Sequence, residues 1–195
     1  MRKEQKANYP ESARGAAALL VRMVLEDGAY TNIALNQYLR GSRLSDLDRR
    51  LATELVYGTV KASGTLDWYL AQCVSRPLDK VAGDILAILR ISTYQLLYMT
   101  RIPASAAVNE AVKLARSVSH EGSAKFVNGV LRGLLRKQEA GAFVLPDAEK
   151  QDADYLSLKY YHPRWLVKRW LGPWGRGGTE RLLAFDNTAA PVCLR

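Results

Sequence analysis

Cysteine and histidine are scarce in this 195-residue chain, which has two of each. Cys73 and Cys193 lie far apart and lack metal-ligand spacing, so neither a zinc site nor a disulfide framework is predicted. The charged amino terminus has no apolar run, so no signal peptide is predicted. The longest apolar segment, residues 85–99, is too short to span a bilayer and contains Arg90 and Gln95. We therefore expect a soluble cytoplasmic protein without a membrane partner.

Strand-like alternation is also missing from residues 11–138, where apolar residues recur at helical spacing. Ser45 followed by Asp48 resembles a capping box that opens a helix. Residues 84–99 are apolar almost all round, which predicts a central helix surrounded by the others. The sequence thus predicts an all-α bundle of about seven helices, near residues 17–25, 31–39, 45–60, 65–74, 84–99, 105–118 and 123–137.

Composition divides the chain into four parts. Residues 1–10 are expected to form a flexible basic arm, and residues 11–138 the helical domain. Residues 139–151 mix glycine, proline and acidic residues and are predicted to be a linker. Residues 152–195 are predicted to be a helical connector, with a helix that opens at Pro163 and a glycine-rich break at 172–178. Because residues 192–194 have the pattern of a strand, we expect an incomplete α/β subdomain there, in a chain that is a fragment.

Basic residues are concentrated in the helical part. Residues 1–138 contain 20 basic and 12 acidic residues, and residues 139–195 contain 8 and 7. Such an excess favours a polyanionic partner, such as nucleic acid or an acidic surface. Solubility alone remains an equal alternative on charge by itself.

Two glycines interrupt the helix predicted over 123–137, and each costs roughly 1 kcal/mol relative to alanine. On a helical wheel Gly129 lies among three cations, Lys125, Arg132 and Arg136, opposite the apolar face. There it can let a phosphate or ribose approach the backbone. Gly133 lies at the flank, where we expect a neighbouring helix.

The preceding helix repeats this arrangement, with Asn109, Lys113 and Arg116 on one face. A basic arm followed by a helix that begins near Arg14 suits RNA, because phosphate contacts supply much of the affinity. Solvated surface is the alternative for these cations. A polar contact between helices is the alternative for both asparagines and is preferred for Asn128. The candidate RNA-binding residues are Arg14, Lys113, Arg116, Lys125, Arg132 and Arg136.

The segment LAILRISTYQLLYMTRIPASAAVNEAVKLARSVSHEGSAKFVNGVLRGLLR closely resembles the matching helices of the NusB family of transcription antitermination factors. Arg14 with the alanines that follow it, and residues 51–60 (LATELVYGTV), are similar to that family's first and third helices. The resemblance covers about residues 11–137. It implies an all-helical RNA-binding fold.

The tail, YHPRWLVKRWLG followed by RLLAFDNTAAPVCLR, resembles the segment after the NusB-like domain in 16S ribosomal RNA cytosine-C5 methyltransferases of the Sun/Fmu type. The resemblance implies the RNA-binding N-terminal portion of such an enzyme, with 16S ribosomal RNA, and not DNA, as its partner. We expect Trp165 and Trp170 to dock against a catalytic domain beyond Arg195; the alternative is that they pack on the bundle.

In that family the catalytic cysteine, the second cysteine and the S-adenosylmethionine site all lie in the later domain. The chain itself is therefore expected to have no catalytic or cofactor-binding residue and to be inert, with Cys73 and Cys193 as core residues. Gly172–Gly178 is not the cofactor loop, because no strand precedes it. Two alternatives stay open: an antitermination-like factor without enzymatic activity, and a protein–protein scaffold whose charge is incidental.

Overall fold

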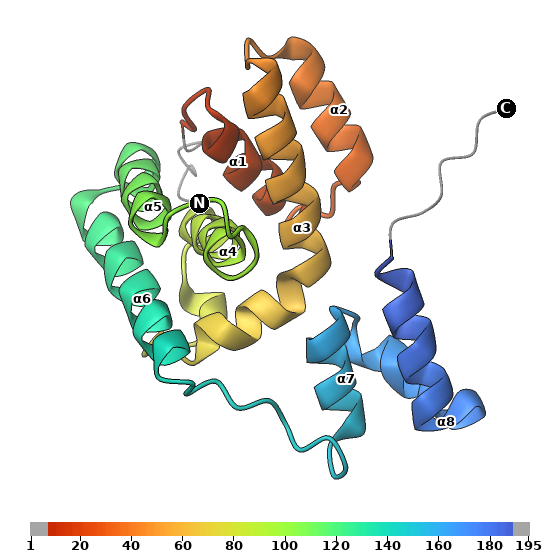
Figure 1. Ribbon diagram of the computed structural model, residues 1–195. Coiled ribbons are helices and arrows are strands. Elements are labelled where there is room, and N and C mark those ends of the chain that lie inside the picture. The colour runs from red at the N-terminus through yellow and green to blue at the C-terminus, as the bar shows by residue number, and fades with distance from the viewer. Residues whose placement is uncertain (1–7, 189–195) are drawn as a thin grey trace, which may run out of the picture. The chain divides into compact units, whose positions relative to one another are not determined.

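A computed structural model of the chain describes residues 8–188, and every regular element in that range is helical (Figure 1). The predicted all-α class is therefore confirmed for these residues. The chain divides into two compact units at the bond between Phe143 and Val144. No helix within residues 8–188 is both long and apolar enough to cross a membrane. The expected strand at residues 192–194 lies outside the described range.

The first unit has side-chain caps at the amino ends of three of its helices. Ser12 accepts a hydrogen bond from the Gly15 amide, and Ser45 accepts one from the Asp48 amide, as the predicted capping box requires. His120 caps the last helix in the same way. The helices of this unit are α1 (Ala13–Leu25), α2 (Thr31–Gly41), α3 (Asp46–Ala71), the 3-10 turn η1 (Leu78–Lys80), α4 (Gly83–Tyr98), α5 (Ala104–Val118) and α6 (Glu121–Glu139).

Helix α3 corrects the predicted number of helices. The two helices predicted over 45–60 and 65–74 form one helix of 26 residues, which bends in Figure 1. Thr59, Ala62 and Leu66 are all buried, so the apolar face continues through the expected break. A single exposed glycine, Gly64, costs a helix only about 1 kcal/mol, and burial of the continuous face outweighs that cost. The described part of the first unit thus has six α-helices.

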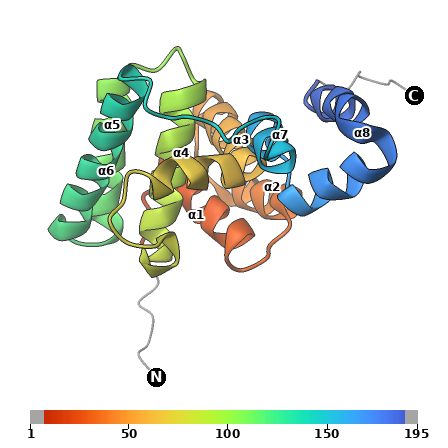
Figure 2. The same cartoon turned by 90° about the horizontal axis from the view of Figure 1, so that it is seen from below.

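Helix α4 occupies the centre of the first unit, as its all-round hydrophobicity predicts. It contacts α1, α3, α5 and α6, and Figures 1 and 2 show α5 and α6 on one side of it and α1 and α3 on another. Residues 85–89 are buried without interruption. The other helices therefore point their apolar faces at α4 and their polar faces away from it.

Helix α3 approaches α4 closely at Gly58. A Cβ atom at this position would lie 2.1 Å from Cζ of Tyr94, so only glycine leaves room for the ring. The Tyr94 hydroxyl donates a hydrogen bond of 2.8 Å to Oε1 of Glu54, one turn earlier on α3. Tyr94 thus crosses the Gly58 backbone and is held on α3 by its hydroxyl.

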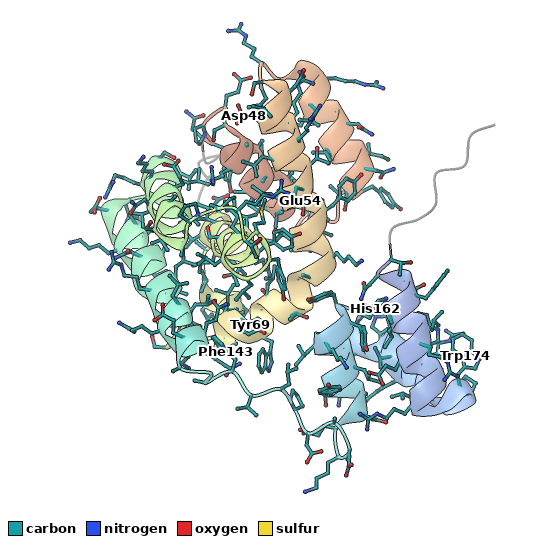
Figure 3. All side chains as sticks on the ribbon, in the orientation of Figure 1. Asp48, Glu54, Tyr69, Phe143, His162 and Trp174 are labelled. Carbon is teal, nitrogen blue, oxygen red and sulfur yellow. The ribbon has the colours of Figure 1, made fainter. Side chains whose placement is uncertain are left out.

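Aromatic packing closes the first unit after α6. Tyr69 and Phe143, labelled in Figure 3, meet edge to face with ring centroids 4.7 Å apart. The Lys137 ammonium donates a hydrogen bond of 2.6 Å to the carbonyl of Gln72. Both contacts join the end of α6 to the end of α3.

The second unit contains α7 (Asp152–Tyr160) and α8 (Arg164–Asp186). Tyr161 has a left-handed backbone (φ 60°) and ends α7, and Pro163 precedes the first residue of α8. The predicted glycine-rich break is a kink inside α8, where Gly175 has φ 57°. Across the kink the helix continues to Asp186. The core of this unit is small and comprises Ala153, Leu156, Val167 and Leu183.

The close contact at Gly58 predicts that a larger residue at this position lowers the stability of the protein. Gly58→Ala should lower the free energy of unfolding by about 1–3 kcal/mol, because the new methyl group must displace the Tyr94 ring. Gly64→Ala is the matched control on α3: no atom lies within 4 Å of its Cβ position, so it should raise stability by about 0.5–1 kcal/mol. Urea unfolding of both variants measures the difference. Equal effects of the two substitutions would contradict the close crossing.

Candidate nucleic-acid interface

Helices α5 and α6 form an antiparallel hairpin through the turn at Ser119 and His120. On α5, Ala111 and Ala115 are buried, and on α6, Val127 and Leu131 are buried. These are the faces that helical periodicity assigned to the core, so that prediction is confirmed. The opposite sides of both helices are exposed and carry the basic residues.

Five of the six candidate RNA-binding residues are exposed on this hairpin. Lys113 and Arg116 lie on α5, and Lys125, Arg132 and Arg136 on α6. The sixth, Arg14, is half-buried in the first turn of α1, where its Nε donates a hydrogen bond of 2.9 Å to Oε1 of the buried Gln95 on α4. Arg14 thus has a structural contact besides any contact with a ligand.

Two of these cations each form an ion pair with a carboxylate of the hairpin. Lys113 Nζ lies 2.8 Å from Oε1 of Glu110, and its hydrogen bond, followed by the charge of Arg14, holds the pKa of Glu110 below its usual value. Arg116 Nε lies 2.6 Å from Oε2 of Glu121, and its hydrogen bond lowers the pKa of that carboxyl, with a smaller contribution from Lys125. Lys113 and Arg116 are thus each held beside a carboxylate on the hairpin.

These ion pairs are exposed, with more than 40% of each side chain accessible in both pairs. Exposed pairs contribute little to stability, because solvent and salt screen them. A phosphate can therefore compete with the carboxylates for the cations at small cost. The pairs keep Lys113 and Arg116 oriented without removing them from the surface.

A cavity of about 330 Å³ lies between the two helices near their other end. Asn109 lines it from α5, and Arg132 and Leu135 line it from α6. Arg132 is the one candidate residue among the lining residues of this cavity. Its Nε donates a hydrogen bond of 3.0 Å to Oδ1 of Asn128, four residues earlier on the same helix.

The contact of Asn128 corrects a prediction. We expected Asn128 to satisfy a polar contact between helices inside the bundle, but its partner is Arg132 on its own helix. Asn128 lies at the edge of the buried face, one turn before Arg132, and the i, i+4 spacing brings the two side chains together. Asn128 therefore orients a cation on the exposed side of α6.

The two glycines of α6 differ in their surroundings. Around the Cβ position of Gly129 no atom lies within 4 Å, so the exposed backbone there is open to a ligand. The prediction that a neighbouring helix contacts Gly133 is wrong, because the nearest atom is Nη2 of Arg136 at 4.0 Å. Gly133 faces the side chain of its own helix, since residues three apart share a face.

A second cavity, of about 540 Å³, was not predicted from the sequence. Arg76 and Lys80, from the segment between α3 and α4, line one part of it, and His120, Ser123 and Phe126 line another. The Arg76 guanidinium lies over the Phe126 ring, 4.7 Å from its centroid, in a cation–π contact. The aromatic ring thus holds an exposed cation at the cavity.

The electrostatics of this second cavity favour an anion. Ala82, which precedes the first residue of α4, and Gly122 and Ser123, in the first turn of α6, all line it. Two helix amino termini therefore meet at the cavity, and their dipoles attract negative charge. Together with Arg76 and Lys80 they form a site suited to phosphate.

Only tertiary structure reveals this second cavity. Its lining residues come from 75–85 and 119–126, which are more than thirty residues apart. A partial indication exists in the sequence, because Arg76 and Lys80 flank Pro77 where no helical face explains them. Phe126 is half-buried, and the Arg76 guanidinium lies over its ring.

Cys73 and the glycine-rich segment 172–178 have the following surroundings in the described residues. Cys73 is half-buried against the main core, and burial raises the pKa of its thiol above the usual value. Gly172–Gly178 lies within α8 and not between a strand and a helix, so it does not fit the phosphate loop of a Rossmann-like cofactor site. Cys193 lies outside the described range.

With the fold and the two cavities described, comparison with known proteins defines the class. The NusB family model matches residues 11–136, and the chain belongs to the NusB family. A crystal structure of antitermination factors NusB and NusE in complex with dsRNA has the same fold: the TM-score is 0.59 at 20% identity, over 65% of this chain and 95% of that one.

Proteins longer than this chain are also similar to it in sequence. The chain is 40% identical over 184 residues to the probable ribosomal RNA small subunit methyltransferase B of Synechocystis sp. and 36% identical over 171 residues to that of Bacillus subtilis. The alignments cover 94% and 88% of this chain but 40% and 37% of the relatives. The chain thus spans about two fifths of their length, and it is similar to one part of each.

The open surroundings of both α6 glycines predict that alanine is tolerated. Gly129→Ala and Gly133→Ala should each raise the free energy of unfolding by about 0.5–1 kcal/mol, because alanine restricts the unfolded chain and meets no close atom. Thermal unfolding monitored by circular dichroism measures both. A loss of stability in Gly133→Ala would mean that another helix does pack there.

Proposed function

We propose that this chain is the RNA-binding N-terminal portion of an S-adenosylmethionine-dependent 16S ribosomal RNA cytosine-C5 methyltransferase. In this proposal the first unit binds ribosomal RNA, in preference to DNA, in the cytoplasm. The second unit leads to a catalytic domain that holds the cofactor and the reactive cysteine, and docks with it. The described residues 8–188 contribute binding, and methyl transfer takes place elsewhere in the protein.

The observation that carries this proposal is the length of the similarity to the methyltransferase relatives. A 184-residue alignment cannot be contained in residues 11–136, so it continues through α7 and α8. The two units therefore occur together in relatives that are named as methyltransferases and are more than twice as long.

The surface of the first unit supports RNA as its ligand. Exposed cations line the α5–α6 hairpin, and Gly129 leaves the helix backbone open between Lys125 and Arg132. The cavity at Arg76 adds two helix amino termini. Phosphate contacts of this kind bind RNA without reading its sequence, and the open cavity with its aromatic wall suits an unpaired nucleotide.

An antitermination-like factor without enzymatic activity is the second candidate. The similarity of this fold to that of NusB favours it. The first unit accounts for that similarity, because 65% of this chain covers 95% of the NusB chain. The second unit, with α7 and α8, extends beyond that comparison. For this reason the methyltransferase portion is the better proposal.

The hairpin surface predicts a loss of RNA binding on charge reversal. Arg132→Glu with Arg136→Glu should weaken binding of single-stranded RNA roughly 10-fold at about 0.1 M salt and lower the salt slope by about 1.4, which is 0.7 for each lost phosphate contact. Fluorescence anisotropy of a labelled oligonucleotide at several salt concentrations measures both. Circular dichroism checks that helicity is unchanged.

The matched control reverses two exposed cations of α3, Arg50→Glu with Lys61→Glu, and changes the net charge equally. This control should shift the affinity by less than the hairpin variant and leave the slope nearly unchanged. If both double variants weaken binding equally, the effect is one of net charge and the assigned surface is wrong.

The second cavity predicts a separate contribution. Arg76→Glu with Lys80→Glu should also weaken RNA binding roughly 10-fold, since the negative charges oppose a phosphate at the two helix amino termini. Phe126→Leu should remove the stacking surface and weaken binding less. The same anisotropy titration measures these effects, and wild-type affinity in the Arg76/Lys80 variant would exclude the cavity from the interface.

A further inference from the structure

The first part of α8 combines aromatic and basic residues without any acidic residue. Residues 164–178 contain three tryptophans and four cations, and no aspartate or glutamate. Elsewhere in the second unit acidic residues are frequent, at 147, 149, 152, 154, 180 and 186. Residues 164–178 therefore carry a net positive charge, and the rest of the unit carries a net negative charge.

The three tryptophans have different surroundings. Trp170 is half-buried and packs against the small core around Val167. Trp174 stacks on Trp170 with ring centroids 5.9 Å apart, and Figure 3 labels it together with His162. Trp165 has 66% of its surface exposed. Of the two tryptophans expected to dock elsewhere, Trp170 thus serves the core of its own unit, and Trp165 remains available.

Trp165 shares its face of α8 with two cations. Lys168 and Arg169 follow it at i+3 and i+4, so all three project from the side opposite the buried Val167. Gly172, at i+7, has no atom within 4 Å of its Cβ position, so the same side stays open for another turn. An exposed indole is thus adjacent to two long cationic side chains on a flat, uncovered helix face.

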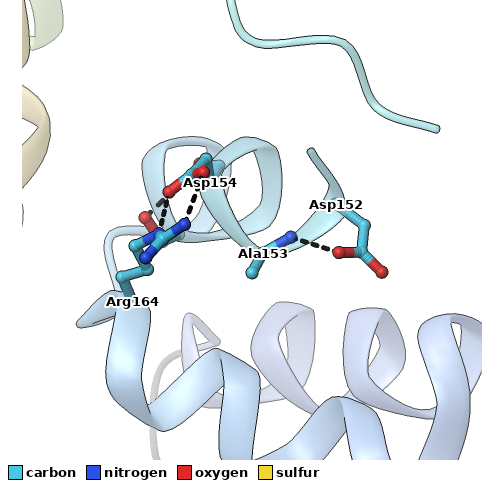
Figure 4. A network of polar contacts seen from close by, with 5 residues as sticks. Asp152, Ala153, Asp154 and Arg164 are labelled. Carbon is cyan, nitrogen blue, oxygen red and sulfur yellow. Dashed lines mark hydrogen bonds and ion pairs between the residues drawn. The ribbon is translucent and has the colours of Figure 1, made fainter. Parts of the chain in front are cut away.

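Two other cations of the second unit, Arg164 and Lys159, are already paired. Arg164 donates hydrogen bonds to Asp154 through Nε and Nη2 (Figure 4), with Nη2 2.9 Å from Oδ2. Lys159 Nζ lies 3.0 Å from Oε1 of Glu180. Within the described residues, the ion pairs of this unit do not include Lys168 or Arg169. Among the described residues of this unit, no ion pair therefore neutralises Lys168 or Arg169.

We propose that Trp165, Lys168 and Arg169 form a second contact for single-stranded RNA, separate from the α5–α6 hairpin. Trp165 stacks on an unpaired base, and the two cations bind phosphates on either side of it. Base stacking on an aromatic platform beside positive charge is the common mode of single-strand binding. This inference rests on the proposed function, because it takes RNA as the ligand of the chain.

The chemistry of this face favours RNA over a protein partner. Lysine is depleted at the cores of protein interfaces, where tryptophan and arginine are enriched, so Lys168 is the residue that disfavours a protein contact here. On this face two of the three long side chains are charged, and the open glycine adds no apolar surface. A polyanion satisfies both cations, and a protein domain must either desolvate them or supply matching acids.

The test uses the full 195-residue chain and a labelled single-stranded oligouridine as the probe. Lys168→Glu with Arg169→Glu should weaken binding roughly 10-fold and lower the salt slope by about 1.4. Trp165→Ala should weaken binding about 5-fold or more, and Trp165→Phe should restore most of the affinity because a phenyl ring still stacks. In wild type, oligouridine should quench part of the tryptophan fluorescence, and Trp165→Phe should remove that part.

Matched controls are available in the same unit. Trp174→Ala removes another exposed tryptophan, and Lys150→Glu with Arg181→Glu reverses two other exposed cations. Both should bind oligouridine nearly as wild type does. Circular dichroism confirms that each variant keeps its helices.

The outcomes separate this inference from the proposed function. Weakened binding in the α8 variants, with intact controls, supports a second RNA contact. Wild-type binding in those variants, while Arg132→Glu with Arg136→Glu still weakens it, overturns this inference alone and leaves the α8 face to a protein contact. If the wild-type chain does not bind oligouridine in a salt-dependent manner, the proposed function fails and this inference fails with it.

Discussion

The burial of α4 is the constraint on which the first unit depends. Four helices cover it, and each must turn an apolar face inward to do so. This requirement permits the close approach at Gly58, where the Tyr94 ring passes over the backbone of α3. It also decides which sides of α5 and α6 face outward. The basic surface of the hairpin is therefore a consequence of how α4 is enclosed.

The packing of helices around α4 also creates the second cavity, at Arg76 and Lys80. The amino termini of α4 and α6 come together beside the segment that carries Arg76 and Lys80. Helix termini bring fixed positive potential without further side chains. The first unit thus offers two kinds of anion contact: long cationic side chains on the hairpin, and the dipoles of two helix amino termini at the cavity. The cationic side chains can move to meet a ligand, whereas the fold fixes the positions of the helix termini.

The second unit is stabilised in a different way from the first. Its core contains four buried apolar residues among those described, so aromatic stacking of Trp170 and ion pairs such as Arg164 with Asp154 add to its stability. A core this small cannot enclose every tryptophan, and Trp165 is left outside with Lys168 and Arg169. The kink at Gly175 limits the exposed basic face to the first part of α8. Exposure of Trp165 thus follows from how little this unit can bury.

The sequence by itself determined the helical class, the capping box at Ser45, the core faces of α5 and α6 and the exposure of their cations. These features depend on residues within about four positions of one another, which periodicity and capping report directly. It predicted a break in α3 that the continuous buried face removes, and it assigned wrong partners to Asn128 and Gly133. Tertiary structure alone decided that Gly58 lies beneath Tyr94 and that Arg76 lies over Phe126. Those pairs are 36 and 50 residues apart, and only the packing of whole helices brings them into contact.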